Sequence, residues 1–219
     1  NIVSGHVSGT VRLGEFSPFE AFDEYNFHTG VVLQNTAGQL SGLSDTVFDE
    51  IAFGLINQGM SEEEASKSVV RAACQMGLED LLEQAPDTLS GGQTQRLAIA
   101  SEIAFDPEFL IMDDPTSQMD PVGRKEFFEW LAGCSEKTIF IVSNEVDDLC
   151  EIADQLWVLE KGELIASGKP LDVINQVAEG HDLHLPVVYR MAKELGKKLP
   201  SGLFPVKLSE LKGCFDDQH

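Results

Sequence analysis

The sequence predicts an α/β fold with a mainly parallel β-sheet. Between residues 89 and 168, short apolar segments alternate with segments of helical periodicity. The apolar segments 109–112, 138–143 and 156–159 are partly β-branched and suit strands that are buried on both faces. Such alternation is typical of strands joined by helices, and therefore of a parallel sheet.

Length, composition and charge indicate a globular protein that does not bind nucleic acid. The 219 residues can form one domain with an appendage, and 42% of them are apolar, as in a globular protein. The formal net charge of −22 repels phosphate backbones, so we expect no nucleic acid among the partners. The acidic surface suits either solubility alone or a basic partner surface.

Cysteine spacing and hydropathy indicate a cytosolic protein. The four cysteines are scattered without a CxxC pair, which favours free buried thiols in a reducing compartment. No apolar run reaches the roughly 18 to 20 residues that span a bilayer, and no signal peptide is visible. The chain is therefore expected to be soluble, although it can still bind a membrane protein.

Two extended segments are expected near the N-terminus. They lie at residues 9–13 and 30–33, an irregular acidic stretch separates them, and the second ends at Gln34. Residues 35–45 are polar and rich in turn formers, a composition typical of a loop.

Helical periodicity and capping signals predict the helices. Ser61 and Glu64 have the spacing of a capping box that opens one helix, and Pro107 ends another. The helices are expected at about 47–55, 61–77, 91–105, 121–132, 146–153, 171–178 and 186–195. A turn at residues 161–162 leads into a strand at 163–166, and the end of the chain is a tail containing proline and glycine.

These elements suggest a main domain at residues 1–168, with a helical subdomain at about 36–100. Residues 169–219 then form a small C-terminal helical extension.

The first candidate functional segment is Leu89-Ser90-Gly91-Gly92-Gln93. Ser90 and Gln93 have the spacing of a capping box, which by itself only satisfies a helix end. Two glycines in a helix each cost about 1 kcal/mol relative to alanine, so they need a reason. Close approach of the backbone amides to a phosphate is such a reason.

The second candidate is a pair of carboxylates, Asp113 and Asp114, directly after the apolar segment 109–112. They are either solvated acids in a loop or functional groups. In the functional interpretation the first organises Mg²⁺ and the second orients or deprotonates a water molecule.

Together these segments resemble the signature and Walker B motifs of ABC-type ATPases, because residues 95–100 (Gln-Arg-Leu-Ala-Ile-Ala) continue the first motif. The stretch from Gln34 to Leu55, which ends in Glu-Ile-Ala-Phe-Gly-Leu, and the tail at 185–200 are similar to the ATPases of energy-coupling-factor transporters. Those transporters import vitamins and transition-metal ions such as cobalt and nickel in prokaryotes. The resemblance covers nearly the whole chain and implies a P-loop NTPase-like fold.

The resemblance implies ATP and Mg²⁺ as cofactors and assigns a role to each site residue. Those implied to contact nucleotide are Ser90, Gly91, Gly92, Gln93 and Asp120; those implied in hydrolysis are Asp114, Asn144 and Gln34; those implied for Mg²⁺ are Asp113 and Gln34.

Two residues depart from the family pattern. Asp114 stands where similar proteins carry glutamate, so its reach is shorter by roughly 1 to 1.5 Å. Asn144 stands where a histidine contacts the γ-phosphate, and an amide has no titratable nitrogen. Both changes predict a slow or inactive site.

The phosphate-binding loop Gly-x-x-x-x-Gly-Lys-[Ser/Thr] is missing from the sequence. Gly168-Lys169 is followed by Pro170, and Gly196-Lys197 by a further lysine, so neither fits. In the family the loop lies shortly before the residues that match 8–11. We therefore expect that the chain begins after it, that the fold is incomplete at the N-terminus, and that the fragment alone is inactive.

The resemblance implies two partners: a second ABC ATPase domain, in a homodimer, a heterodimer or a tandem, and an integral membrane transporter subunit. It places the protein on the cytoplasmic, inner face of a prokaryotic cell membrane. Asp45, Asp49 and Glu50 are candidate contacts for arginines of the membrane subunit.

The leading hypothesis is the degenerate half of an asymmetric ATPase pair that drives import. The alternatives are a non-catalytic interaction or regulatory fragment and a nucleic-acid-associated ABC ATPase. His181 and His184, with residue 182 between them, are more typical of a surface loop than of a metal site.

Overall fold

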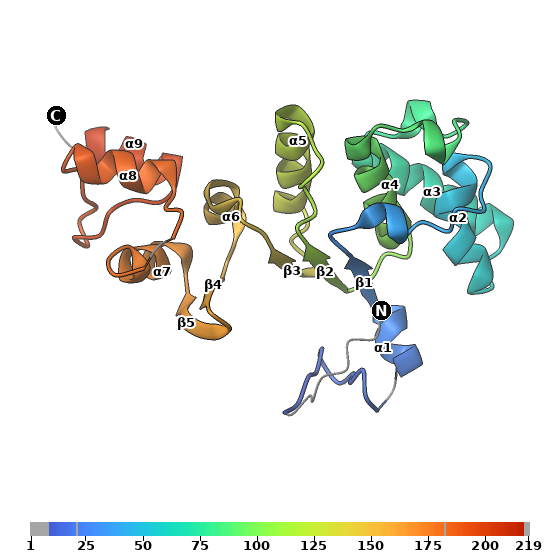
Figure 1. Cartoon of the computed structure of the whole chain (residues 1–219), viewed down its shortest axis with the longest axis horizontal. Coiled ribbons are helices and arrows are strands. Elements are labelled where there is room, and N and C mark those ends of the chain that lie inside the picture. Colours follow the sequence, from blue (N-terminus) through green and yellow to red (C-terminus); the bar gives the residue numbers. More distant parts are fainter. Residues whose placement is uncertain (1–8, 21, 182, 217–219) are drawn as a thin grey trace. The chain divides into compact units, whose positions relative to one another are not determined.

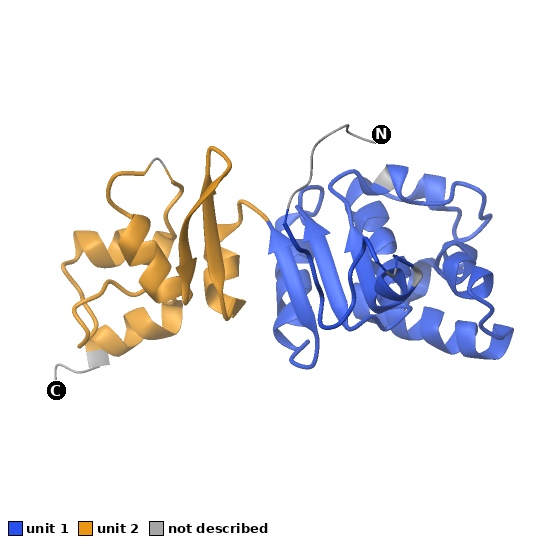
Figure 2. Cartoon of the chain, turned by 90° about the horizontal axis from the view of Figure 1, so that it is seen from below, with its two compact units in different colours: residues 1–142 blue, residues 143–219 orange. Residues whose placement is uncertain are grey.

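The computed structural model describes residues 9–20, 22–181 and 183–216. The chain forms two compact units, Asn1–Val142 and Ser143–His219 (Figure 2). This division into compact units differs from the expected domain boundary at residue 168. That boundary marks where the C-terminal extension begins, and it stays a prediction. Within the described part of the chain, every helix is too short or too polar to cross a membrane.

The first unit contains a parallel three-stranded sheet, as the sequence predicts. Its strands β1 (Thr29–Val32), β2 (Phe109–Asp113) and β3 (Thr138–Val142) lie in the order β1-β2-β3 (Figure 1). The central strand β2 carries the fully buried side chains of Leu110 and Met112.

Helices α2, α3 and α4 gather beside β1 and form the helical region of this unit (Figure 1). The helices of the first unit are α1 (Phe22–His28), α2 (Val47–Asn57), α3 (Glu62–Met76), α4 (Gly91–Ile103) and α5 (Pro121–Ala132). Short 3-10 helices lie at Thr36–Gly38, Glu79–Leu81 and Pro86–Thr88. Buried Ile51, Leu55, Leu97 and Ile99 belong to the core here.

The capping signals predicted for α3 are confirmed. The Ser61 hydroxyl accepts a hydrogen bond from the Glu64 amide, and the Glu64 carboxylate accepts one from the Ser61 amide. The helix ends at Gly77, whose φ of 62° is left-handed and is adopted by glycine at little steric cost. The next long helix, α4, ends at Ile103 rather than at residue 105, because Asp106 (φ 56°) closes its last turn onto the Ile103 carbonyl.

The second unit contains an antiparallel hairpin and helices. The elements are α6 (Val146–Ile152), β4 (Leu156–Glu160), β5 (Glu163–Gly168), α7 (Pro170–Val177), α8 (Val187–Glu194) and α9 (Leu208–Asp216). Two buried clusters hold it together: one of Cys150, Ile174, Tyr189 and Val206, and one of Ala166, Val173 and Val177. All four cysteines are free as expected, but only Cys150 is buried, and burial raises the pKa of its thiol to about 12.

Four expectations about the elements are wrong. Residues 9–13 form no strand, because the only pairing there is a single bridge from Leu13 to Phe16 across a tight turn. Strands β3 and β4 are not buried on both faces, because exposed residues alternate with partly buried ones along each of them. Among the described residues, β3 pairs with β2 and β4 pairs with β5. The acidic N-terminal stretch and the tail contain helices α1 and α9, which the sequence analysis missed.

Candidate functional site

The carboxyl ends of β1 and β2 bring three predicted site residues to the same edge of the sheet. Val32 is in register with Met112, so Gln34 and Asp114 each follow two residues beyond a paired position. Asp113 is the last residue of β2, is exposed, and pairs with Val142 of β3. Oxygen donors of Gln34, Asp113 and Asp114 therefore lie at the strand ends where parallel sheets bind ligands.

Asp114 has an unusual backbone conformation that the fold holds in place. Its φ of 48° lies in the left-handed region, which aspartate visits more readily than most residues with a side chain. Its amide donates a hydrogen bond of 2.8 Å to the Val142 carbonyl, which ties the turn to the end of β3. The backbone of Asp114 is thus held between β2 and the end of β3.

Ser90 and Gln93 form the predicted capping box at the start of α4. The Ser90 hydroxyl accepts from the Gln93 amide (3.3 Å), and the Gln93 side-chain oxygen accepts from the Ser90 amide (2.8 Å). The amides of Gly91 and Gly92 lie in the first helical turn, where a helix offers no acceptor of its own. They are free of intrahelical partners and can bind an anion.

The structure supplies a packing reason for Gly92 and a weaker one for Gly91. A Cβ atom at Gly91 would lie 2.8 Å from the Gln118 side-chain oxygen. One at Gly92 would lie 3.0 Å from the Gln118 main-chain oxygen and 3.5 Å from the Met119 Cα. The start of α4 therefore packs directly on the chain that follows β2. Packing against the main chain explains Gly92, whereas the neighbour of Gly91 is a side-chain end that can move, so close approach to a phosphate stays the predicted reason for Gly91.

Gln95 is a site residue that sequence reasoning missed. It is fully buried, and its side-chain amide donates to the Asp114 carbonyl (3.2 Å) and the Ser117 hydroxyl (3.3 Å). Its side-chain oxygen accepts from the Gln118 amide (2.8 Å). One signal for this burial is present in the sequence: Gln95 lies in the same predicted helix as the apolar residues 97–100, close enough to share their buried face.

Asp120 is the N-cap of α5. Its carboxylate accepts a hydrogen bond of 2.8 Å from the Gly123 amide, and Pro121 follows at the first helical position. This structural role accounts for an acid at position 120, and contact with nucleotide stays a prediction.

Asn144 belongs to the second compact unit. It is exposed, and its carbonyl accepts from the Val146 amide (2.9 Å) just before α6. Its place two residues beyond β3 follows from the sequence, and its catalytic role stays a prediction.

The donors at the sheet edge fit a magnesium ion held through a nucleotide. No group of three or more His, Cys, Asp or Glu suited to a metal occurs among the residues that the structure describes. Mg²⁺ bound to a nucleotide needs no such group, because one or two carboxylates and the phosphates complete its coordination. Asp113 and Gln34 are the residues that would hold it. His181 instead lies 3.1 Å from the Glu160 carboxylate.

Glu50 is not available as a surface contact for a partner. It is 5% exposed, and its carboxylate accepts from the Ser41 amide and from the Ser41 hydroxyl (2.6 Å). The Asp49 carboxylate likewise accepts from the Thr46 hydroxyl that caps α2. Asp45 is exposed and lines a groove of about 470 Å³ together with Leu40, Gly42, Ser44, Glu50, Ala85, Pro86, Asp87, Leu89 and Thr94.

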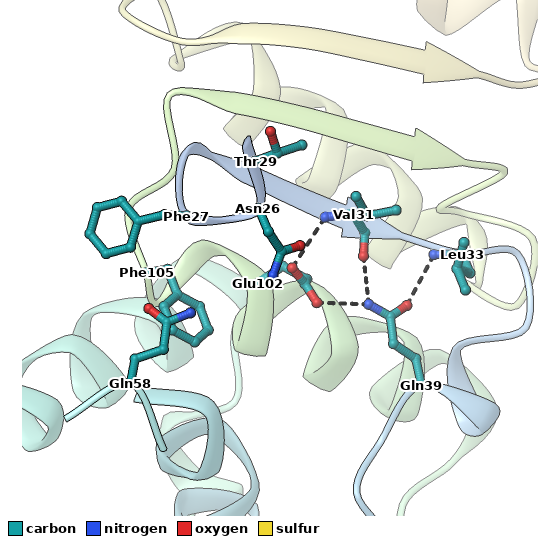
Figure 3. Close-up of a pocket in the computed structure, with 9 residues that line it drawn as sticks. All are labelled: Asn26, Phe27, Thr29, Val31, Leu33, Gln39, Gln58, Glu102 and Phe105. Atoms are coloured by element: carbon teal, nitrogen blue, oxygen red, sulfur yellow. Dashed lines mark hydrogen bonds between the residues drawn. The ribbon is translucent and has the colours of Figure 1, made fainter. Parts of the chain in front are cut away.

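A second cavity, of about 310 Å³, lies against the edge of β1 that faces away from β2 (Figure 3). The Gln39 side chain pairs with this edge like a short strand, accepting from the Leu33 amide (3.0 Å) and donating to the Val31 carbonyl. Glu102 of α4 accepts from the Val31 amide (3.1 Å) and from the Gln39 side chain (2.8 Å). Burial raises the pKa of the Glu102 carboxyl, while these hydrogen bonds lower it in part.

Comparison with known proteins gives a consistent result. The family model described as ABC transporter matches residues 5–117. The energy-coupling factor transporter ATP-binding protein EcfA2 of Streptococcus pyogenes serotype M28 (strain MGAS6180) is 38% identical over 191 residues, which cover 84% of this chain and 68% of that protein.

Solved structures agree with the sequence relatives. The structure of cbiO1 from Clostridium perfringens, part of the ABC transporter complex cbiONQ, has a TM-score of 0.65 and 28% identity, covering 83% of this chain and 68% of that chain. The dimeric structure of MJ0796, a bacterial ABC transporter cassette, has a TM-score of 0.62 and 25% identity, covering 71% of this chain and 68% of that chain.

Proposed function

The chain belongs to the ABC transporter ATP-binding family, and from this membership we propose that it couples ATP binding and hydrolysis to import by an energy-coupling-factor type transporter. Its similarity to EcfA2 and to cbiO1, which is part of a transporter complex, supports this assignment. In the proposal the protein works at the cytoplasmic face of the membrane with a second ATPase domain and a membrane subunit, and it uses ATP with Mg²⁺.

Within that function, the chain is the degenerate half of an asymmetric ATPase pair. The observation that carries this proposal is the contrast between the signature segment and the hydrolytic positions of this chain. The signature segment (residues 89–93) keeps its sequence, and its capping box leaves the Gly91 and Gly92 amides at an open helix start. The hydrolytic positions instead hold Asp114 and Asn144, which are shorter or uncharged replacements.

The asymmetry follows from how such domains pair. In a head-to-tail dimer, the signature segment of one domain faces the phosphates bound by the other. This chain would therefore complete a competent site on its partner. Its own site, at Asp113 and Asp114, would chiefly bind nucleotide and hydrolyse it slowly or not at all. The helix dipole and the free amides stabilise the γ-phosphate charge across that interface.

The groove beside α2 is the proposed contact for the membrane subunit. Exposed Asp45 and Asp87 line it and give it an acidic rim, so a basic helix of a partner is the complementary occupant. Glu50 shapes the groove by holding the Ser41 loop and does not itself face the partner.

Steady-state ATP turnover of the assembled transporter tests the asymmetry. We expect Ser90→Arg to lower turnover by about 100-fold, because a large cation at the helix start blocks the amides that stabilise the transition state. Asp114→Asn should change turnover less than about 3-fold. Ser61→Arg is the matched control, since it removes the same kind of capping box from α3 and leaves the signature segment intact.

The outcomes separate the alternatives. Unchanged turnover in Ser90→Arg, together with its loss in Asp114→Asn, would reverse the assignment of the two sites. A wild-type complex without turnover would favour the non-catalytic interaction fragment. Tight binding of a labelled oligonucleotide at physiological salt would favour a nucleic-acid-associated ATPase, against the expectation from the net charge of −22.

A further inference from the structure

We infer that Gln95 is a positioning residue that joins the signature segment to the chain after β2, so that both are presented to a partner as one rigid surface. The loop concerned, residues 114–118, is called the post-β2 loop below. This inference rests on the proposed function for its consequence in catalysis, whereas the junction itself is a property of the isolated chain.

The Gln95 side chain binds the post-β2 loop at three points. Its amide nitrogen reaches the Asp114 carbonyl and the Ser117 hydroxyl, and its oxygen receives the Gln118 amide. These contacts use both polar atoms of the side chain, which is 0% exposed. A buried amide with both ends occupied has one orientation, so the loop is fixed in direction as well as in distance.

The same two segments also meet through their backbones. Gly92 packs on the Gln118 carbonyl so closely that an added Cβ would lie 3.0 Å away. Gln95 lies one helical turn beyond Gly91 and contacts the same loop from the side of the helix. The start of α4 thus contacts the loop at two successive points along the helix, at Gly92 and at Gln95. Rotation of the helix would break the Gln95 hydrogen bonds.

The junction connects two groups with different tasks. On one side are Ser90 and the Gly91 and Gly92 amides, which face outward at the helix start. On the other is Asp114, whose carbonyl is held by Gln95 and whose amide is held by Val142. A shift of the signature segment on binding phosphate would therefore be transmitted to the backbone of Asp114 by the Gln95 side chain, which binds its carbonyl directly.

Two substitutions separate the contacts. Gln95→Leu keeps a similar volume and removes every hydrogen bond. Gln95→Glu keeps an oxygen that accepts from the Gln118 amide but loses the amide donor to the Asp114 carbonyl and the Ser117 hydroxyl. Ser101→Ala is the matched control, because it removes a partly buried side-chain hydrogen bond, to the Leu97 carbonyl, elsewhere in α4.

The first measurement is amide hydrogen exchange on the full chain, which needs neither nucleotide nor partner. We expect exchange of the Gln118 amide to accelerate about 10-fold in Gln95→Leu, as for the loss of one hydrogen bond, and to stay near wild type in Ser101→Ala. Equal protection of this amide in wild type and Gln95→Leu would overturn the inference, whatever the chain does in a transporter.

The second measurement is ATP turnover of the assembled transporter. We expect kcat to fall about 10-fold in Gln95→Glu and further in Gln95→Leu, with KM for ATP changed less than about 2-fold, because Gln95 acts through the loop and not on the nucleotide. Normal kcat in Gln95→Glu would overturn the role in catalysis. If turnover were also insensitive to Ser90→Arg, the proposed function would fail while the exchange result still stood.

Discussion

At the scale of single residues, Gly91 and Gly92 look equivalent in the sequence but differ in their surroundings. A Cβ at Gly91 would meet only the far end of the Gln118 side chain, which can move. A Cβ at Gly92 would meet the Gln118 main chain, which Gln95 holds in place. The two positions therefore predict opposite responses to the same substitution.

We expect Gly91→Ala to leave the free energy of unfolding unchanged or raised by up to about 1 kcal/mol, because alanine favours the helix. Gly92→Ala should lower it by about 1 to 3 kcal/mol, the usual cost of forcing an atom into a packed contact. Urea unfolding of both variants provides the measurement. Equal effects would show that the contact with Gln118 does not constrain the helix start.

Residue-scale prediction from sequence succeeded where a signal is local and failed where it is tertiary. The capping boxes at Ser61 and Ser90 need only residues three apart, and both are confirmed. The burial of Gln95 depends on a loop more than 20 residues further on, which no local pattern reveals. The glycines lie between these cases: the need for a reason was visible, and at Gly92 the reason found is packing against the main chain of Gln118.

At the scale of elements, side chains bind the edge of strand β1 that faces away from β2. Gln39 and Glu102 bind the backbone of Val31 and Leu33 where another strand would otherwise pair (Figure 3). Side chains that occupy an exposed edge protect it from pairing with other chains. This position has a cost in free energy, because burial disfavours the charged form of Glu102.

The pH dependence of stability should reveal this carboxyl. Burial raises the pKa of Glu102 above its ordinary value of 4.5, so the folded chain binds this proton more tightly than the unfolded chain. The contribution of the protonated Glu102 carboxyl to the free energy of unfolding is therefore complete below the unfolded-state pKa. It is lost as pH rises through the folded-state pKa. We expect wild type to lose stability relative to Glu102→Gln as pH rises above 4.5 and through the raised folded-state pKa.

Chemical unfolding of both proteins across that range measures the difference. Glu136→Gln, which neutralises an exposed acid before β3, is the control and should remain parallel to wild type. A constant difference between wild type and Glu102→Gln at every pH would contradict the raised pKa.

Long, strongly periodic elements were predictable, whereas elements whose environment depends on other strands were not. Helices α3 and α5 agree with the expected ranges because their caps and apolar positions lie within the segment itself. The apolar composition of β4 suggested a buried parallel strand, but its partner is β5 and alternate side chains are exposed. Composition indicates a strand and says little about which strand will pair with it.

At the scale of the whole molecule, the fold class and the family were both predictable, because each depends on many residues at once. The alternation of strands and helices predicted parallel strands, although not their order β1-β2-β3, and the similarity to EcfA2 extends over 84% of the chain. The division into two compact units at residue 142 was not foreseen, since it depends on which elements contact each other and not on their order.

The net charge of −22 sets the conditions for binding a membrane subunit. An acidic protein attracts a basic surface over a distance limited by salt, so charge acts mainly on the association rate. Asp45 lies on the rim of the groove beside α2, whereas Glu136 is an exposed acid in the turn before β3. Replacing either acid with lysine raises the formal net charge by two, so the two variants differ only in where the charge changes.

We expect Asp45→Lys to slow association with the purified membrane subunit by about 3- to 10-fold at low salt, with a smaller effect near 0.5 M salt because screening removes the attraction. Glu136→Lys should change the rate less than about 2-fold. Association rates measured by surface-immobilised binding at both ionic strengths decide between a local contact and a general field. If both variants slow binding equally, the attraction belongs to the whole acidic surface, and the groove loses its assignment as the membrane-subunit contact.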